Sequence, residues 1–285
     1  MDRQSSFHLS IPLSGGLSLR IQDKDNEQNP YPSSRIQKGL VLWHGNEDLS
    51  EEGVGFGVPV FKRGHRTIYP GSVKLDSRTE GGLTWVKASY DMNILEKAYI
   101  NEEPVGRTPF YRIHETLSRW HRKHPFLRAF LRHSGALVRR AFHIRIRFEE
   151  GASAGLASVE FKIDAEKRTI LIALDAGSVS SWSKNEIFMM NELGANFFDL
   201  YNDSDGSELK KESIGTWGEV SAREATFSDS SRGISFTLWN ADGAKMFRGR
   251  ELVPGKLAWA GLSYQLPRYV TSFSYLIKIE SGVFL

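Results

Sequence analysis

Hydrophobic and polar residues alternate along much of the chain. In residues 142–148, Phe and Ile occupy every second position while His and Arg occupy the others, and residues 17–21, 159–163 and 234–238 follow the same pattern. A period of two places alternate side chains on opposite faces of a strand, so each segment is predicted to be a strand with one face on a core. Residues 169–174 form a continuous apolar run, which predicts a strand covered on both faces.

Further strands are predicted between polar turns. They cover residues 7–11, 54–61, 83–90, 187–190, 195–201, 219–227, 257–264 and 273–279. Many strands joined by short turns, with almost no helix between them, predict an all-β fold. We expect a mostly antiparallel large β-sandwich, or supersandwich, that occupies residues 1–285 as a single domain. No repeat of fixed period is present, which disfavours a propeller.

Residues 108–141 are the exception to this pattern. Ile113, Leu117 and Trp120 recur at helical spacing, and Pro125 then interrupts the pattern. A proline is tolerated in the first turn of a helix, so a second helix is predicted to begin there. The segment is therefore predicted to be an insert of two short amphipathic helices between the N-terminal and C-terminal strand blocks. Its basic face consists of Arg128, Arg132 and Arg139.

The positive charge of the chain is concentrated in the same region. Between Arg107 and Arg147 there are 11 Lys and Arg and a single acid, Glu115, whereas the rest of the chain holds 26 basic and 33 acidic residues. The net charge of +3 thus divides into +10 for the segment and −7 for the remainder. A basic surface can dock an anionic partner such as nucleic acid or lipid headgroups. We favour long Arg side chains lying over the acidic remainder, which argues against a nucleic-acid partner. Trp120 also fits an oligomer interface on the insert.

Composition excludes several classes of chemistry. The chain has no cysteine, so disulfides, thiolate metal sites and a cysteine nucleophile are excluded. The polar N-terminal residues do not resemble a signal peptide, and no apolar run approaches the roughly 18 residues that span a bilayer. These features predict a cytoplasmic protein without a membrane span. His121 and His124 lie three residues apart, but no carboxylate ligand accompanies them, so neither a metal nor a cofactor is predicted.

Two motifs have both a structural and a ligand-binding interpretation. Residues 53–60, Gly-Val-Gly-Phe-Gly-Val-Pro-Val, lack the following helix of a dinucleotide fingerprint and the Lys-Ser/Thr of a Walker loop. We interpret them as closely packed strand backbone, or as a bare strand face on which a sugar ring or an aromatic side chain rests. Residues 201–212 resemble a calcium loop, but Tyr201 replaces the first aspartate, so a polar hairpin is favoured.

Polar residues near strand ends supply the candidates for chemistry. Acid–base catalysis needs a carboxylate or an imidazole within reach of the reacting atom. The candidates for that role are His65, Glu192 and Glu251. The candidates for ligand binding are Trp43, His44, Arg66, Arg248 and Arg250. Arginine suits a carboxylate or phosphate because its planar fork donates two hydrogen bonds, and tryptophan is a platform on which sugar rings stack.

The chain resembles the galactose-mutarotase-like β-supersandwich group. The resemblance rests on antiparallel strands over most of the chain and on residues 39–43, 53–60 and 192–201, followed by a C-terminal half rich in Trp and Tyr. It implies a supersandwich that binds carbohydrate on a concave sheet face. The mutarotases of the group use histidines and a glutamate, and the basic insert is not part of the group's pattern. The candidates of these residue types are His44, His65, Glu192 and Glu251.

Two functions from different classes follow from these observations. The first is binding of carbohydrate, or of an anionic sugar derivative, on a concave sheet face, with or without isomerase- or lyase-type proton abstraction. The second is a non-enzymatic protein whose basic helices dock an anionic partner or form an oligomer interface. Phosphate contacts weaken steeply with added salt whereas stacking on a sheet does not, so salt dependence separates the two.

Overall fold

The computed structural model describes residues 7–22, 35–63, 66–100, 103–104, 145–179, 186–253 and 257–282. Within these ranges the chain forms strands and one short 3₁₀ helix, η3 (Lys211–Ile214). The predicted helical insert at 108–141, with its basic face of Arg128, Arg132 and Arg139, lies outside them and stays a prediction. No helix of the described ranges is long and apolar enough to cross a membrane.

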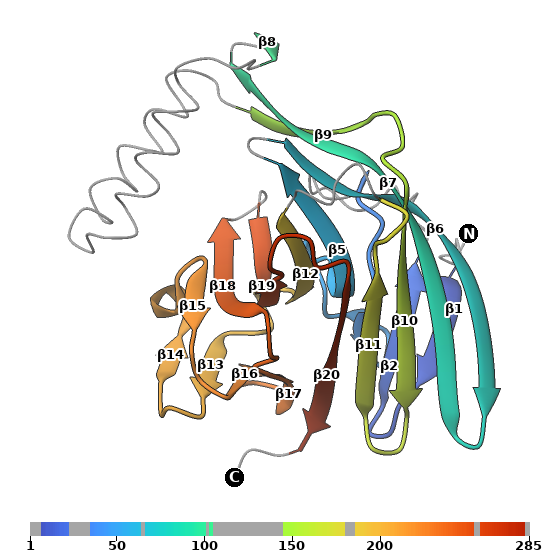
Figure 1. Ribbon diagram of the computed structural model, residues 1–285. Helices are drawn as coiled ribbons and strands as arrows, with labels where there is room; N and C mark the ends of the chain where they lie inside the picture. The colour runs from blue at the N-terminus through green and yellow to red at the C-terminus, as the bar shows by residue number, and fades with distance from the viewer. Residues whose placement is uncertain are drawn as a thin grey trace, which may run out of the picture.

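The strands of these ranges build two antiparallel sheets (Figure 1). The smaller sheet has the order β1-β2-β3-β4, and the larger sheet has the order β14-β13-β16-β17-β20-β11-β10-β7-β6-β5-β12-β19-β18-β15, with β8 and β9 also paired to β7. The bounds are β1 (Phe7–Pro12), β2 (Leu17–Gln22), β3 (Val41–His44), β4 (Glu47–Asp48), β5 (Gly55–Arg63), β6 (Arg66–Glu80), β7 (Leu83–Ile100), β8 (Glu103–Pro104), β9 (Arg145–Glu150), β10 (Leu156–Asp164), β11 (Thr169–Asp175), β12 (Glu186–Leu193), β13 (Leu200–Asp203), β14 (Glu208–Lys210), β15 (Gly218–Val220), β16 (Glu224–Asp229), β17 (Ile234–Trp239), β18 (Lys245–Val253), β19 (Leu257–Gln265) and β20 (Ser272–Ser281).

The larger sheet folds back on itself, so that its two halves face each other across one core. Phe56 on β5 meets Phe236 on β17 edge to face, with ring centroids 5.3 Å apart, although these strands are far apart in the sheet order. Tyr264 on β19 contacts Tyr275 on β20 in the same core, at 4.8 Å between centroids. Buried aliphatic side chains of both sheets fill the space around these rings. The predicted all-β, antiparallel, sandwich-like fold is therefore confirmed.

The alternating segments that the structure describes form strands as predicted, but β17 and β11 differ from the predictions in their burial. All of residues 234–238 are buried, so the prediction of a single covered face for this segment was wrong. Only every second side chain of β11 is buried, and Leu171 is 42% exposed. Its register partner on β20, Leu276, is exposed as well. The prediction that residues 169–174 are covered on both faces was wrong, because one face of this part of the sheet is open to solvent.

Two predicted strands have different bounds in the structure. Residues 195–197 form a turn, residues 198 and 199 are not part of a strand, and β13 begins only at Leu200. In that turn the backbone N–H of Asn196 donates to the Glu51 carboxylate at 2.9 Å, which draws the chain out of the sheet. Residues 219–227 divide at Ser221 into β15, which pairs with β18, and β16, which pairs with β13 and β17.

The glycine-rich residues 53–60 pack against other parts of the chain. A Cβ atom on Gly53 would lie 2.6 Å from the carbonyl oxygen of Glu192, and one on Gly57 would lie 2.5 Å from the ring of Phe161. Gly57 also has φ of 76°, which favours glycine. The interpretation as closely packed strand backbone is therefore confirmed, and the aromatic ring at Gly57 belongs to the protein's own core.

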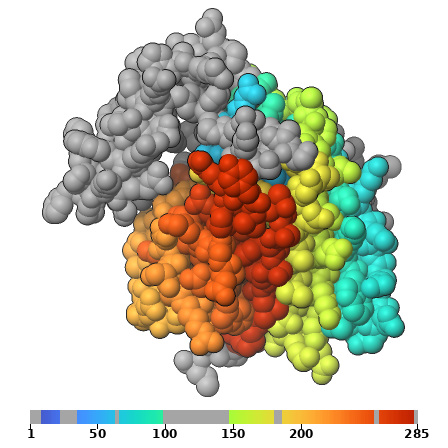
Figure 2. Space-filling model, in the orientation of Figure 1, coloured from blue at the N-terminus to red at the C-terminus, as the bar shows by residue number. Residues whose placement is uncertain are grey.

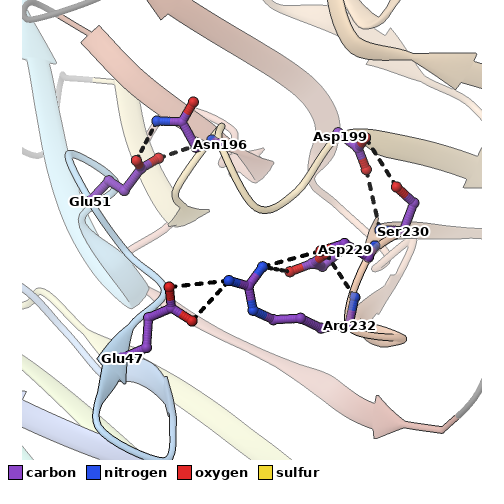
Figure 3. A network of polar contacts seen from close by, with 8 residues as sticks. Glu47, Glu51, Asn196, Asp199, Asp229, Ser230 and Arg232 are labelled. Carbon is purple, nitrogen blue, oxygen red and sulfur yellow. Dashed lines mark hydrogen bonds and ion pairs between the residues drawn. The ribbon is translucent and has the colours of Figure 1, made fainter.

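Polar side chains fasten the smaller sheet to the larger one (Figure 3). The guanidinium of Arg232, in the turn between β16 and β17, donates to both carboxylate oxygens of Glu47 on β4, at 3.1 and 2.9 Å. It also donates to the buried carboxylate of Asp229, at 2.9 Å. Four residues along from Glu47, Glu51 accepts the two hydrogen bonds of Asn196. These contacts fix the segment that carries Glu52 against the larger sheet.

Candidate functional site

Strand β12 has two faces with different surroundings. The side chains that enter the main core are those of Ile187, Met189, Asn191 and Leu193. The side chains on the opposite face are those of Phe188, Met190 and Glu192. Because side chains alternate along a strand, the paired residues of neighbouring strands extend the second face across the sheet.

This second face, called the outer face below, spans β5, β12, β19 and β18. Register pairing places Glu192 of β12 beside Gly261 of β19, and Gly261 beside Gly249 of β18. The outer face consists of Val58, Val60, Phe188, Met190, Glu192, Trp259, Gly261, Ser263, Phe247, Gly249 and Glu251. It therefore combines apolar side chains, two glycines and two carboxylic acids on one continuous surface of the sheet.

Glu192 is the most unusual group on the outer face. Its side chain is only 6% exposed, and it lies next to an apolar cluster that includes Val54, Val58 and Met190. Burial, together with the smaller effect of the nearby charge of Glu52, raises the pKa of Glu192 to about 8. Within the described ranges no donor forms a hydrogen bond to its carboxyl group. Glu192 is therefore a buried carboxylic acid that is mostly protonated at neutral pH.

Glu52 is the ionisable group that acts on Glu192, and Lys38 in turn is acted on by Glu52. Glu52 is 5% exposed and accepts a hydrogen bond from the backbone N–H of Ala258 at 3.2 Å. Lys38 donates from Nζ to the Ser50 hydroxyl at 3.0 Å and to the carbonyl oxygen of Glu51 at 2.5 Å. Burial lowers the pKa of Lys38, and the charges of nearby acids, Glu52 among them, oppose that shift. Glu52 thus lies within the electrostatic reach of both Glu192 and Lys38.

Tyr69 of β6 borders the same group. Its hydroxyl donates to the Glu96 carboxylate at 3.1 Å, and its ring meets that of Phe148 edge to face with centroids 5.3 Å apart. Burial raises the pKa of Tyr69, and the charges of Glu96 and Glu192 raise it further. The phenol therefore stays neutral at physiological pH and lies within electrostatic reach of Glu192.

An aromatic cluster lies on the outer face toward β18. The ring of Trp217, in the segment that precedes β15, lies 6.0 Å from Phe188, 6.2 Å from Phe247 and 6.2 Å from Trp259 between centroids. Trp217 is 41% exposed and has φ of 56°, a left-handed conformation that is uncommon for a bulky residue. A backbone held in this region at a solvent-facing aromatic residue is a recurrent feature of binding sites.

A buried hydrogen-bond network supports β12 from the core side. The Asn191 side-chain oxygen accepts from the Tyr275 hydroxyl at 2.8 Å and from the backbone N–H of Gly57 at 3.1 Å. The second bond satisfies a backbone group at the irregularity in the β5–β12 pairing. Asn191 therefore fixes the strand position from which the neighbouring Glu192 projects.

The structure brings some of the predicted site residues together and separates others. Glu192 and Glu251 both lie on the outer face. Arg248 and Arg250 lie on the opposite face of β18: the Arg248 guanidinium is 4.9 Å above the Tyr201 ring, and the Arg250 guanidinium donates to the Ala195 carbonyl at 2.9 Å. The sequence left open whether these arginines meet the two glutamates in one pocket, and in the structure they lie on opposite faces of the sheet, because adjacent residues of a strand point to opposite sides.

The other predicted residues lie away from this face or outside the described residues. Trp43 and His44 belong to β3 of the smaller sheet, where the Arg20 guanidinium lies 4.2 Å over the Trp43 ring. Arg66 is exposed at the start of β6. His65 lies outside the described ranges, as do Arg128, Arg132 and Arg139. Glu192 is thus the candidate that the structure places in an environment suited to chemistry.

Sequence reasoning missed several members of this site. They are Lys38, Glu52, Tyr69, Trp217 and Trp259. One signal was present: Glu52 directly precedes the glycine-rich segment, and glycines that let two backbones approach also bring their flanking side chains together. Nothing in the sequence indicates that Trp217, which lies 25 positions after Glu192, returns to the same sheet face.

Residues 201–212 form the polar hairpin that was favoured over a calcium loop. They include β13, β14 and the start of η3, and Asp203 Oδ1 accepts the backbone N–H groups of Asp205 and Ser207 at 3.1 and 3.0 Å. In the part of the chain that the structure describes, no three His, Asp or Glu side chains are grouped so as to hold a metal ion.

Comparison with known proteins yields structural neighbours of low similarity. No protein-family model matches the chain, and no curated protein matches its sequence. A solved α-N-acetylgalactosaminidase, NagBb from Bifidobacterium bifidum in complex with GalNAc, aligns with a TM-score of 0.49 and 9% identity over 96% of this chain and 36% of that chain. An α-galactosidase from Lactobacillus brevis aligns with a TM-score of 0.39 and 7% identity, over 96% of this chain and 39% of that chain. The Slr1438 protein from Synechocystis aligns with a TM-score of 0.36 and 7% identity, over 99% of this chain and 98% of that chain. This chain thus spans just over a third of the two glycosidases, and we base no functional conclusion on likeness at this level.

Proposed function

We propose that the protein binds a neutral carbohydrate on the outer face, with Glu192 as a proton donor and acceptor at the sugar. The observation that carries this proposal is the position of a buried, protonated carboxyl group on the same sheet face as the exposed ring of Trp217. Sugar rings stack on aromatic faces through their C–H groups and form hydrogen bonds at their edges, so a ligand of this class needs both features.

The spacing of the outer-face residues suits such a ligand. Trp259 is two residues from Gly261, the register partner of Glu192, which corresponds to about 7 Å along the strand. Phe188 is four residues from Glu192 on β12 itself, about 13 Å at strand spacing. Phe188 and Trp259 lie on opposite sides of Glu192 along the strand direction, because Phe188 pairs with Gln265 and Glu192 pairs with Gly261. A sugar stacked on the rings of this cluster therefore spans the position of Glu192 and reaches the carboxyl group with its edge.

The charges around Glu192 favour a neutral sugar over an anionic one. Glu52 lies within electrostatic reach of Glu192, and Glu96 lies within reach of the neighbouring Tyr69. The two arginines that suit a carboxylate or phosphate point to the other face of β18. An anionic ligand would be repelled by these carboxylates. We therefore narrow the proposed ligand class to neutral carbohydrate.

The proposed chemistry is proton transfer at a sugar oxygen or carbon, as in isomerisation. A general acid or base is most effective when its pKa lies near the working pH, and the pKa of Glu192 is about 8. Glu192 donates its proton as a neutral acid and takes one back as a carboxylate. Glu52, held by the Ala258 N–H, is the companion charge that keeps the Glu192 proton from being lost to water.

Calorimetric titration of neutral mono- and disaccharides tests this proposal. We expect Trp217→Ala to weaken binding by about tenfold or more, because the exposed stacking surface is removed. We expect Glu192→Gln to retain binding but to abolish turnover, because the amide keeps the size of the acid and cannot transfer the proton. The matched control is Trp85→Ala on β7, which removes a partly exposed tryptophan outside the outer face. Equal losses in the Trp217 and Trp85 variants, or full turnover by Glu192→Gln, would contradict the proposal.

A further inference from the structure

Strand β6 has a long stretch with a free edge. β5 pairs with β6 only at Arg66–Ile68 of β6, whereas residues 72–80 pair with β7 on their other side. Among the residues that the structure describes, none pairs with the second edge of 72–80. Ser72, Lys74 and all of residues 76–80 are exposed, and the β6–β7 hairpin forms the outer rim of the molecule in the space-filling view (Figure 2). This rim is independent of the outer face and of the function proposed above.

A free edge of this length is a surface for strand pairing. Nine residues at strand spacing extend about 30 Å, and the outward-facing backbone N–H and C=O groups along that edge have no partner strand within the described ranges. Proteins protect such edges with charged side chains, and this edge carries four of them. Their order along β6 also determines which strand the edge can accept.

The four charges alternate in sign on one face of β6. Lys74, Asp76, Arg78 and Glu80 occupy every second position, so their side chains point to the same side of the sheet. These charges are arranged symmetrically in position but with opposite sign about Ser77. When the strand direction is reversed, each positive residue therefore takes the place of a negative one. An antiparallel copy centred at Ser77 places Lys74 opposite Glu80 and Asp76 opposite Arg78.

Neighbouring registers that keep the charged faces on the same side are unfavourable. Centring the pair at Asp76 places the Asp76 residues of the two copies opposite each other, and places Lys74 of each copy opposite Arg78 of the other. Centring it at Arg78 places Arg78 opposite itself and Asp76 opposite Glu80. Like charges directly opposite each other destabilise a strand pair and opposite charges stabilise it. Only the pairing centred at Ser77 makes all the direct charge contacts attractive while it keeps most of the free edge paired.

We propose that two copies of this chain associate through β6, pairing antiparallel about Ser77 into one continuous sheet. The pairing covers residues 74–80 of each copy, and its two-fold axis passes beside Ser77. Each hairpin tip, Gly81-Gly82, then lies beside the start of the partner's free edge, short of the residues that pair with β5. The interface is smaller than that of a permanent dimer, so it dissociates in the micromolar range or above.

Sedimentation equilibrium over micromolar to submillimolar concentrations tests this proposal. We expect the wild-type chain to reach twice the monomer mass as concentration rises. In the variant Asp76→Arg, the new arginine of each copy lies opposite Arg78 of the other copy, so the dimer gains two repulsive pairs. We expect this variant to raise the dissociation constant by about tenfold or more. The double variant Asp76→Arg/Arg78→Asp restores opposite charges at those positions, and we expect it to dimerise within a few-fold of the wild type.

The matched control is Glu160→Arg. Glu160 lies on β10, which is paired on both sides, and its carboxylate is 3.8 Å from Lys87, the residue that also stands opposite Asp76 on β7. The control therefore makes the same charge reversal near the same lysine away from the edge, and we expect unchanged dimerisation. Thermal unfolding verifies that each variant is folded. A wild type that stays monomeric at every concentration, or a double variant that fails to recover dimerisation while folded, would overturn the proposal.

Discussion

Gly261→Ala is expected to lower the free energy of unfolding by about 3 kcal/mol. A Cβ atom on Gly261 would lie 2.0 Å from the carbonyl oxygen of Asn191 and 2.7 Å from the Cα of Glu192. Both neighbours are backbone atoms of β12, which is paired with β19 through Gly261 itself. No side-chain rotation relieves the overlap, so β12 and β19 must separate at the point where Glu192 is positioned.

Urea unfolding measures this loss, and Gly282→Ala is the matched control. Gly282 has no atom within 4 Å of a Cβ position, so the same substitution there is expected to change the free energy of unfolding by less than about 0.5 kcal/mol. Equal stability of the Gly261 and Gly282 variants would show that β12 and β19 do not approach as closely as described. We also expect Gly261→Ala to lose sugar binding, because the displaced strand carries Glu192.

The stability of the wild-type protein is expected to fall as pH rises from about 4.5 to about 8, through the titration of Glu192. The carboxyl group has an ordinary pKa of 4.5 when the chain is unfolded and a pKa of about 8 when it is folded. Between these values the folded state binds the proton more tightly than the unfolded state, so raising the pH favours unfolding. Each unit of difference corresponds to about 1.4 kcal/mol, which sets an upper limit of about 5 kcal/mol for the total loss.

Comparison with Glu192→Gln isolates this contribution. The amide does not titrate, so the difference in unfolding free energy between the two proteins is expected to grow from pH 5 to pH 8 and then to level off. Other groups with shifted pKa values, such as Lys38, affect both proteins alike and cancel in the difference. Parallel stability curves for wild type and variant over this range would mean that Glu192 titrates normally and does not have the buried environment described.

The sequence predicted the class of fold because the evidence for it is local. Alternation in residues 159–163 identified β10 and its one buried face, since a strand with one face on a core repeats with a period of two. Alternation in residues 234–238 identified the strand β17 but not its burial, because both faces of that strand are covered. It failed where a tertiary contact decides the backbone. The Asn196 turn depends on Glu51, 145 positions away, and neither residue's neighbours indicate that contact.

The candidate site was only partly predictable for a related reason. Glu192 was selected by residue type, and its buried position follows from the apolar residues that other strands bring around it. Arg250 was selected in the same way, but its side chain is directed into the opposite face and is held by the Ala195 carbonyl. Which face a residue occupies depends on where a strand begins and on irregularities such as the one at Gly57, and local pattern does not fix these positions.

The central claim, a carbohydrate site formed by Glu192 and the neighbouring aromatic cluster, is tested most directly by the indole N–H resonances of the 7 tryptophans during titration with a neutral sugar. Single Trp→Phe variants assign the resonances. We expect the signals of Trp217 and Trp259 to shift with the bound fraction while that of Trp85 does not move. Sugar that binds without moving the Trp217 and Trp259 signals, or the absence of any shift across the sugars tested, would contradict it.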